Sequence, residues 1–235
     1  MAAEAGCDEK TVRRWKDRYG VASRPVSETA ALRQARTDEL PARTLEVIEG
    51  ELLGDGSLVS RVRGTTRYAA QYLHHARDRA YLEWLVTQLP GLEHTIFGPY
   101  KPETGTAFVL QTRTYAGLLP LFERWYDPAR PAHRRKRVPL DLRVTPLMAL
   151  HWYLGDGHLA VDRRSPGTKP VIRLSTDGFA LEEVERLAAQ LQHCRARVGR
   201  FGKGHRIVLD SAPFLEWIGH CPVPDVYGYK WRPRA

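Results

Sequence analysis

The spacing of hydrophobic residues changes in a regular order along residues 42–218, and the whole order occurs twice. Apolar residues at i, i+3 and i+4 predict helices, and alternating apolar residues predict strands. Each half is expected to run helix, two strands, helix, two strands, helix. The first half has expected helices over 45–53, 79–89 and 115–126 and strands over 57–63, 66–73, 95–100 and 107–112; the second has helices over 147–154, 181–191 and 213–218 and strands over 158–162, 170–175, 198–202 and 205–209.

Residues at the ends and on the faces of these helices support the assignment. We expect Thr44 to cap the first helix and Gly54 and Gly56 to end it, and Thr145 to cap its counterpart with Pro146 in the first turn. Two helices should each turn one apolar face inward. These inward residues are Tyr81, Leu82, Leu85 and Leu89 in the first half and Leu181, Val184, Leu187, Ala188 and Leu191 in the second.

The pattern therefore predicts an α+β protein with three segments, over residues 1–40, 41–140 and 141–235. The first segment resembles the last two helices of a helix-turn-helix, followed by a polar linker, and its DNA-facing residues would be Thr11, Arg13, Arg14 and Lys16. A solvated amphipathic helical hairpin explains the same residues, and the sequence leaves both interpretations open.

A four-residue motif marks the end of the first helix in each repeat. It reads Leu53-Gly54-Asp55-Gly56 in one half and Leu154-Gly155-Asp156-Gly157 in the other. A carboxylate is unfavourable at a helix C-terminus, where carbonyl groups already carry partial negative charge. If the two helices pack side by side, the carboxylates repel unless a cation lies between them. Hard oxygen ligands select Mg²⁺. The alternative is a simple helix stop and turn, which explains neither the repetition nor the misplaced charge.

Small residues should allow the two motif helices to approach closely. Gly50 and Gly54 form a small face on the first helix, and Gly155 matches Gly54 on the second. His151 replaces Gly50 there, which departs from strict symmetry. We interpret His151 as a satisfied interface residue rather than a metal ligand.

A lysine also recurs near the end of each repeat. Phe122-Glu123-Arg124-Trp125 resembles Phe214-Leu215-Glu216-Trp217, and each is followed by a Lys-x-x-Pro sequence that begins at Lys136 or Lys230. One such lysine would be an ordinary surface charge. Two at matching positions favour a shared functional role.

The overall charge agrees with a polyanionic partner. The net charge is +9 and the pI about 9.7, which favours binding to phosphate backbones. A basic protein without a nucleic-acid role remains an alternative.

Cys7, Cys194 and Cys221 have no CxxC spacing, which argues against a disulfide framework or structural zinc. No export signal or apolar run of about 18 residues is present, so we expect an intracellular protein (cytoplasm or nucleoid) that does not contact a membrane.

With these features together, the chain resembles the LAGLIDADG homing endonucleases of the single-chain type. The resemblance covers about residues 42–233. It implies two αββαββα halves about a pseudo-twofold axis, with the motif helices at their interface and saddle-shaped antiparallel sheets over the DNA major groove. It also implies a monomer that cuts both strands of a long, asymmetric DNA site and leaves 3′ overhangs. The residues that carry it are 48–58, 145–157, 174–184 and Tyr229-Lys230.

The family's functional residues can be placed on matching positions of this sequence. Asp55 and Asp156, with the carbonyls of Gly54 and Gly155, would bind Mg²⁺; Mn²⁺ would substitute, and Ca²⁺ would support binding without cleavage. The metal would activate water for attack on the scissile phosphate, and Lys136 and Lys230 would stabilise the developing charge. Gln71 would order water, with Ser175 as its counterpart. Base and backbone contacts are expected from Arg61, Arg63, Arg67, Arg113, Arg163, Arg164, Lys169, Arg173, Lys203, His205 and Arg206.

Two other functions use the same fold. A non-cleaving transcription regulator would bind DNA without metal-dependent nicking, although it has no need to keep two aspartates and two lysines together. An intron RNA maturase would bind RNA more tightly than DNA. An intein is disfavoured because no splicing sequences flank the nuclease-like region.

Overall fold

The computed structural model describes residues 39–63, 66–100, 107–127, 136–161, 169–202 and 204–232. The expected helix-turn-helix-like segment and linker over residues 1–40 lie outside the described residues, apart from the last two positions. Of those, Leu40 is buried in the core of the unit that begins at Glu39. Within the described part, no helix has the length and apolar character needed to cross a bilayer.

The described unit is a mixed α+β fold built from two repeats of one plan, as the sequence predicts. The first repeat contains α3 (Ala42–Leu53), β1 (Ser57–Arg63), β2 (Thr66–Ala76), α4 (Arg79–Thr87), β3 (His94–Tyr100), β4 (Ala107–Thr112), η1 (Ala116–Leu118) and α5 (Leu119–Trp125). The second contains α6 (Pro146–Asp156), β5 (Gly157–Ala160), β6 (Val171–Ser175), α7 (Leu181–Gln190), η2 (Gln192–Cys194), β7 (Arg197–Phe201), β8 (Gly204–Asp210) and α8 (Ser211–Ile218). A final α9 (Pro224–Tyr227) and η3 (Gly228–Lys230) follow.

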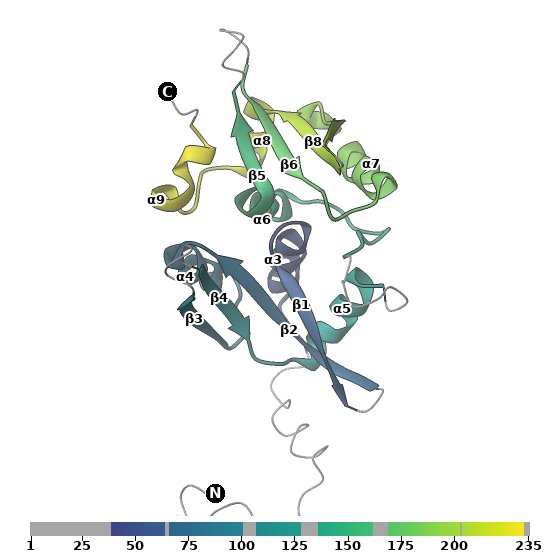
Figure 1. Cartoon of the computed structure of the whole chain (residues 1–235), viewed down its shortest axis with the longest axis vertical. Helices are drawn as coiled ribbons and strands as arrows, with labels where there is room; N and C mark the ends of the chain where they lie inside the picture. Colours follow the sequence, from purple (N-terminus) through teal and green to yellow (C-terminus); the bar gives the residue numbers. More distant parts are fainter. Residues whose placement is uncertain are drawn as a thin grey trace, which may run out of the picture. The chain divides into compact units, whose positions relative to one another are not determined.

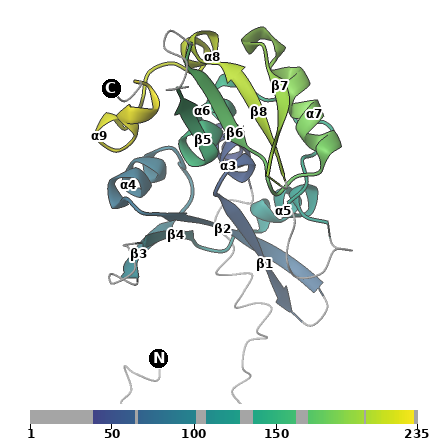
Figure 2. The same ribbon diagram turned by 45° about the horizontal axis from the view of Figure 1, so that its top comes forward.

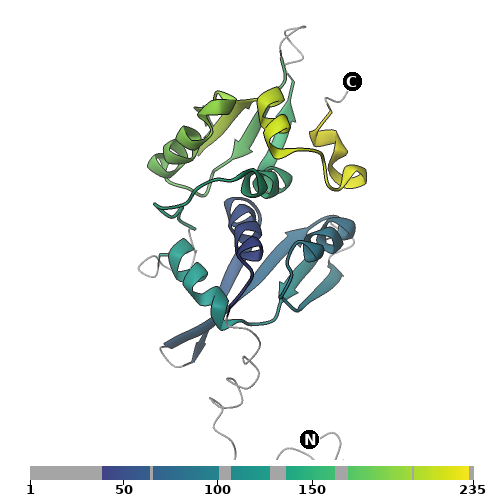
Figure 3. The same cartoon turned by 180° about the vertical axis from the view of Figure 1, so that it is seen from behind.

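The two antiparallel sheets have the same strand order. One runs β1-β2-β4-β3 and the other β5-β6-β8-β7. The motif helices α3 and α6 lie next to each other between the sheets (Figure 1). Seen from behind, α7 and α8 lie across one side of the β5–β8 sheet (Figure 3). The other side of each sheet carries no helix of the described chain and is called the open face below.

Strand register assigns each side chain to one of these faces. Leu58 pairs with Tyr72 and Ile172 with Leu209, and all four are buried under the helices. Because side chains alternate along a strand, their neighbours point to the open face. A shift in register between Arg61 and Val62 changes this pairing near the tip of the β1–β2 hairpin, which extends past the rest of its sheet (Figure 2).

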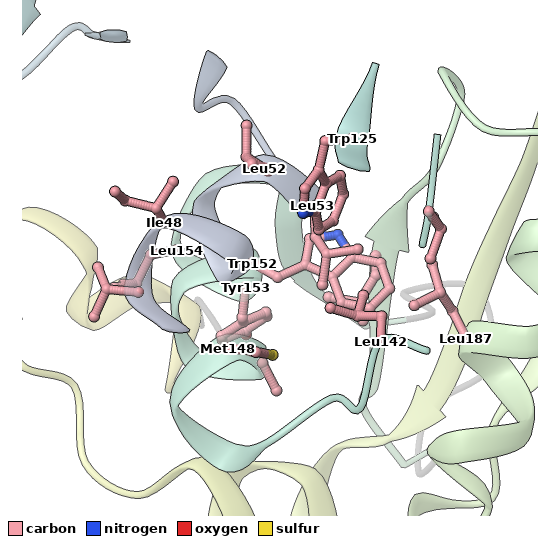
Figure 4. Close-up of a cluster of buried hydrophobic side chains, with 14 of the residues drawn as sticks. Ile48, Leu52, Leu53, Trp125, Leu142, Met148, Trp152, Tyr153, Leu154 and Leu187 are labelled. Atoms are coloured by element: carbon pink, nitrogen blue, oxygen red, sulfur yellow. The ribbon is translucent and has the colours of Figure 1, made fainter. Parts of the chain in front are cut away.

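The core is one continuous cluster that both repeats share. Side chains of α3 and α6 gather with residues from the connecting segment and from α7 (Figure 4). Trp125 and Trp152 are the largest fully buried side chains. Burying an aromatic ring removes 150–250 Å² from water, so we assign much of the cohesion between the repeats to this cluster. Its labelled members are Ile48, Leu52, Leu53, Trp125, Leu142, Met148, Trp152, Tyr153, Leu154 and Leu187.

Three details of the predicted helices differ from the structure. Thr44 does not cap α3, which begins at Ala42; its buried hydroxyl instead donates a hydrogen bond to Pro90 O at 2.8 Å. Leu181 is 39% exposed because it is the first residue of α7, before the helix packs against the sheet. The expected helix over 115–126 is a 3₁₀ turn followed by α5. By contrast, Thr145 caps α6 and accepts a hydrogen bond from Met148 N, as expected.

Candidate active site

The two motif aspartates become neighbours where α3 and α6 end. A Cβ added to Gly155 would stand 3.3 Å from Asp55 N and 3.6 Å from its carboxylate Oδ2. A Cβ added to Gly54 would stand 3.5 Å from Asp156 N. The glycines therefore let the two backbones touch at the point from which both carboxylates leave. This is the convergence that the repeated motif predicts.

The proximity of Asp55 and Asp156 changes the pKa of one of the two carboxyl groups. Burial, and then the charge of Asp55, raise the pKa of Asp156 to about 6, while Lys136 and Lys230 oppose the shift. Two carboxylates so placed share a site where a cation is favoured over a second negative charge.

Each repeat also brings its lysine to the end of its own motif helix. Lys136 Nζ donates hydrogen bonds to Gly54 O at 2.6 Å and Gly56 O at 3.1 Å. Lys230 Nζ donates to Leu154 O at 2.6 Å, Tyr153 O at 3.0 Å and Gly155 O at 3.2 Å. An ammonium at a helix C-terminus satisfies orphaned carbonyls and opposes the helix dipole. The lysines thus sit next to the aspartates at equivalent positions.

The surroundings of the lysines perturb and position them. Burial lowers the pKa of each amine to about 8, although Asp55 and Asp156 pull in the opposite direction. Lys230 is only 4% exposed, and its Nζ lies 4.9 Å from the centroid of the Tyr227 ring. The Tyr153 hydroxyl donates a hydrogen bond to Lys230 O. These contacts hold the amine in one place.

The donor set fits a hard divalent cation. Two carboxylates and two helix-end carbonyls offer oxygen ligands only, the kind that Mg²⁺ prefers. Gly54 O and Gly155 O also accept hydrogen bonds from the lysines, and a carbonyl has a second lone pair to offer. In the described part of the chain, no cluster of three or more His, Cys, Asp or Glu side chains is arranged for a metal. Any metal here would depend on the paired aspartates and the backbone.

Gln71, the residue expected to order water, is hydrogen-bonded to an arginine of the neighbouring strand. It is 4% exposed and lies on the open face of its sheet, where its Oε1 accepts hydrogen bonds from Arg61 Nε at 3.0 Å and Nη2 at 2.5 Å. Its counterpart is also different from the expected one. Register pairs Val59 with Gln71 and Ala160 with Val171, so Val171, and not Ser175, occupies the equivalent position.

The expected DNA-contacting residues divide between the two faces. Arg61, Arg173 and Arg206 lie on open faces. Arg67 lies on the helix side, with its guanidinium 5.7 Å from the Phe122 ring centroid, because the register shift turns it there. His205 alternates with buried Ile207 and so also has the helix-side position.

The remaining expected contacts have other settings. Arg113 is ion-paired with Glu93, Nε to Oε2 at 2.7 Å, just past the end of β4. Lys169 is exposed just before β6. Three of the expected residues and the side chain of a fourth lie outside the described residues: Arg163, Arg164, Lys203 and the side chain of Arg63.

Sequence reasoning missed a buried polar cluster one helical turn before Asp55. Glu51 is 1% exposed; its Oε1 accepts from Tyr81 at 2.9 Å, and its Oε2 accepts from Tyr72 at 3.2 Å. His151 Nδ1 lies 2.6 Å from one carboxylate oxygen and His74 Nδ1 2.7 Å from the other. A polar residue at a helix position that faces the core was the available signal.

The cluster joins the repeats, because His151 belongs to α6 and the other members to the first repeat. Burial alone would raise the pKa of Glu51, but the neighbouring histidines outweigh it and hold that pKa well below its usual range. The sequence predicts that His151 is an interface residue with its hydrogen bonds satisfied. This is true of Nδ1, which contacts Glu51, whereas the buried Nε2 has no hydrogen-bond partner among the described residues.

The fold has two repeats that are joined through motif helices containing glycine. Each repeat contributes one aspartate and one lysine to the site, and this combination points to a two-repeat nuclease fold. The model of the LAGLIDADG DNA endonuclease family matches residues 45–213. The chain belongs to this family.

Solved structures share the fold, and one curated relative is similar in sequence. The homing endonuclease I-WcaI bound to its DNA recognition sequence is similar with a TM-score of 0.70 and 18% identity, over 92% of this chain and 97% of that one. The I-SmaMI LAGLIDADG homing endonuclease bound to cleaved DNA has a TM-score of 0.52 and 14% identity, over 81% and 87%. An uncharacterised protein of Methanocaldococcus jannaschii is 28% identical over 86% of this chain and 74% of its own length.

Proposed function

We propose that this protein is a site-specific DNA endonuclease that cuts both strands of a long, asymmetric duplex site in a Mg²⁺-dependent reaction and leaves 3′ overhangs. One observation carries the proposal: an aspartate and a lysine from each repeat meet where the motif helices end. Two equivalent sets of groups suit two equivalent chemical steps, one on each strand. The single chain supplies both sets, so we propose that it acts as a monomer.

Asp55 and Asp156 would hold the metal, with Gly54 O and Gly155 O as further ligands. A bound divalent cation would supply an activated water and neutralise charge on the scissile phosphate. Mn²⁺ is expected to substitute for Mg²⁺, and Ca²⁺ to support binding without cleavage. The aspartates act as ligands in this scheme and not as general bases.

The lysines would act on the phosphate and its leaving group. Their ammonium groups are fixed by carbonyl hydrogen bonds before any substrate arrives, so little reorganisation is needed when negative charge develops on the phosphate. A lowered pKa also lets each amine release or accept a proton near neutral pH more readily than an exposed lysine. Each lysine would serve the strand cut on its side.

The open faces of the sheets would bind the duplex. Arginine from β1, β6 and β8 lies there, and arginine forms bidentate contacts with guanine edges and with phosphates. The surplus of positive charge, +9 over the whole chain, suits a phosphate backbone.

A cleavage selection tests the proposal. The full chain is incubated with a randomised duplex DNA library in Mg²⁺, and cut ends are captured and sequenced. We expect enriched double-strand cuts with 3′ overhangs, lost with EDTA and in Asp55→Asn and Asp156→Asn. Asp141→Asn, an exposed carboxylate paired with Arg124, is the matched control and should cut normally. Retained cleavage in both motif variants would refute the proposed metal site, and specific binding of the same DNA without cleavage would instead indicate a regulator.

A further inference from the structure

The open face of the β5–β8 sheet carries a group of three side chains that we call the Phe201 platform: Arg173 from β6, Arg206 from β8 and Phe201 from β7. The guanidinium carbons of Arg173 and Arg206 lie 5.1 Å and 5.3 Å from the centroid of the same Phe201 ring. Register puts all three on one face, because Arg206 pairs with Ser175 and with Gly199. One aromatic ring thus positions two cationic forks, with cation–π attraction to each.

Two glycines give the platform its shape. A Cβ on Gly199 would stand 2.9 Å from Phe201 Cε2, so the ring lies over a position that no side chain occupies. A Cβ on Gly204 would stand 2.3 Å from Asp177 Oδ1. That carboxylate, through Oδ2, lies 3.8 Å from Arg206 Nη2. Both arginines therefore have neighbours that limit their rotamers before any ligand binds, which lowers the entropy cost of binding.

Two donor atoms of the platform have no acceptor among the described residues. The Nε atoms of Arg173 and Arg206 are buried without a hydrogen-bond partner, although the Arg206 side chain as a whole is 30% exposed. The distance of 3.8 Å between Arg206 Nη2 and Asp177 Oδ2 is too long for a hydrogen bond. The two guanidinium groups are held by packing and charge. Because both Nε atoms are buried, a ligand on the open face would be contacted through the Nη atoms at the ends of the side chains.

The matching face of the β1–β4 sheet has a different chemistry. Its arginine, Arg61, donates through Nε and Nη2 to Gln71 Oε1. Around it the register places a mixed set of described side chains on that side, and no second arginine is among them: Ser57, Val59, Ala69, Leu73, His75, Thr95, Phe97, Val109 and Gln111. The two sheets are alike in topology and unlike in the groups they present.

We propose that Arg173 and Arg206 each read a guanine in the half-site bound by the second repeat, and that Phe201 positions both. The proposal rests on the proposed function, because it assumes duplex DNA on the open face. Arginine is bidentate to guanine O6 and N7 in the major groove, and a planar fork fixed by a ring suits that geometry. Arg173 pairs with His158, two residues after Asp156. The guanines should therefore lie in the part of that half-site closest to the cleavage centre, and the first repeat's half-site should lack this pair.

Binding selection with the full chain tests this assignment. Ca²⁺ replaces Mg²⁺ so that a randomised duplex library is bound and not cut, and bound sequences are compared between the wild type, Arg173→Gln, Arg206→Gln and Arg79→Gln. We expect each of the first two variants to lose preference for guanine at one position, by about 10-fold to 100-fold against other bases. Arg79→Gln, which removes an exposed arginine on α4 that is paired with Glu83, is the control and should leave both guanines in place.

Two further variants separate positioning from charge. Arg206→Lys keeps the charge but removes the planar guanidinium that Phe201 positions, so it should weaken the guanine preference at that position, although less than Arg206→Gln does. Gly199→Ala leaves both arginines intact but displaces the Phe201 ring, so it should weaken the preference at both positions together. Thermal unfolding of every variant checks that the fold is retained.

The possible contrary outcomes differ in what they overturn. If specific sites are recovered but the variants weaken binding uniformly without changing any base preference, the arginines contact phosphates, and the inference is wrong while the proposed function stands. If cleavable sites are found but none contains the two guanines, the inference is likewise wrong. If no sequence is enriched by the wild type in either selection, the proposed function and the inference fail together.

Discussion

At the scale of single residues, the lysine at the end of the second motif helix is both buried and charged, two properties that rarely occur together. Lys230 is nearly fully buried, yet its ammonium donates to three carbonyls of α6. The hydrogen bonds and two aspartates favour the charged form, and burial disfavours it. Burial is the larger effect, and the pKa is lowered from 10.5 to about 8.

This lowered pKa predicts how stability changes with pH in the absence of metal. Between about pH 8 and 10 the unfolded chain holds a proton on Lys230 that the folded chain has lost, so the free energy of unfolding should rise with pH in this range. Lys230→Met should remove about 1–2 kcal/mol of that rise. Urea unfolding in EDTA at several pH values measures it. An identical pH dependence in the variant would contradict the prediction.

At the scale of elements, sequence and structure agree where one strong signal decides the outcome. Hydrophobic periodicity fixes the order of helices and strands in both repeats, and the glycines of the motif fix the contact between α3 and α6. Asp55, Asp156, Lys136 and Lys230 could be paired because the repeat aligns them. Their convergence in space matches the expectation, and their chemical roles stay predictions.

Long-range contacts explain what the sequence did not predict. Thr44 carries a good capping side chain, but Pro90 on another segment takes its hydroxyl. Arg67 turns to the helix side because of a register shift that leaves no mark in the hydrophobic pattern. In the sequence, Glu51 cannot be distinguished from a solvated charge. Its partners Tyr72, Tyr81 and two histidines come from three other elements and meet it only in the folded chain.

The Glu51 cluster should contribute strongly to the cohesion of α3, β2, α4 and α6. Glu51→Gln leaves buried partners incompletely paired, so we expect the free energy of unfolding to fall by roughly 3–5 kcal/mol. Because the pKa of Glu51 is lowered from 4.5, its stabilising effect is present above pH 4.5 and fades as the pH falls. The difference in free energy of unfolding between variant and wild type should therefore become smaller in acid.

The exposed pair of Glu83 with Arg79 provides the control, and Glu83→Gln should cost less than about 1 kcal/mol. Equal losses in the two variants, measured by urea unfolding, would show that the cluster has no special role.

The contact between α3 and α6 should not tolerate a methyl group at Gly50. A Cβ there would stand 2.7 Å from Met148 O and 2.8 Å from Met148 Cα, which are backbone atoms that cannot turn away. Alanine favours a helix by about 1 kcal/mol over glycine, yet we expect Gly50→Ala to destabilise the protein by ~1–3 kcal/mol through overpacking. Gly178→Ala, where a Cβ meets nothing within 4 Å, should change the melting temperature little. A melting temperature for Gly50→Ala at or above that of the wild type would mean that the helices separate without cost.

At the scale of the whole molecule, the net charge of +9 predicts binding that depends strongly on salt. Each phosphate contact contributes about 0.9 to the slope of log affinity against log salt concentration. We expect Lys169→Gln to reduce the magnitude of that slope by about one while leaving sequence preference unchanged. Arg79→Gln, which removes an exposed charge on α4 that is already paired with Glu83, should not change the slope. Fluorescence anisotropy with one selected duplex from 50 to 200 mM salt measures both, and a change of sequence preference in Lys169→Gln would assign this residue to a base instead.

The tight glycine contact between α3 and α6 has a consequence for the shape of the target. Neither helix has room to slide along the other, so the two DNA-binding surfaces are held at one distance and one angle. A duplex turns about a tenth of a full revolution with every base pair. Adding or removing a single base pair at the middle of the target would rotate one half-site away from its sheet, and the protein has no soft joint within the motif helices to follow it. We therefore expect the protein to discriminate against targets of the wrong length as strongly as against targets of the wrong sequence.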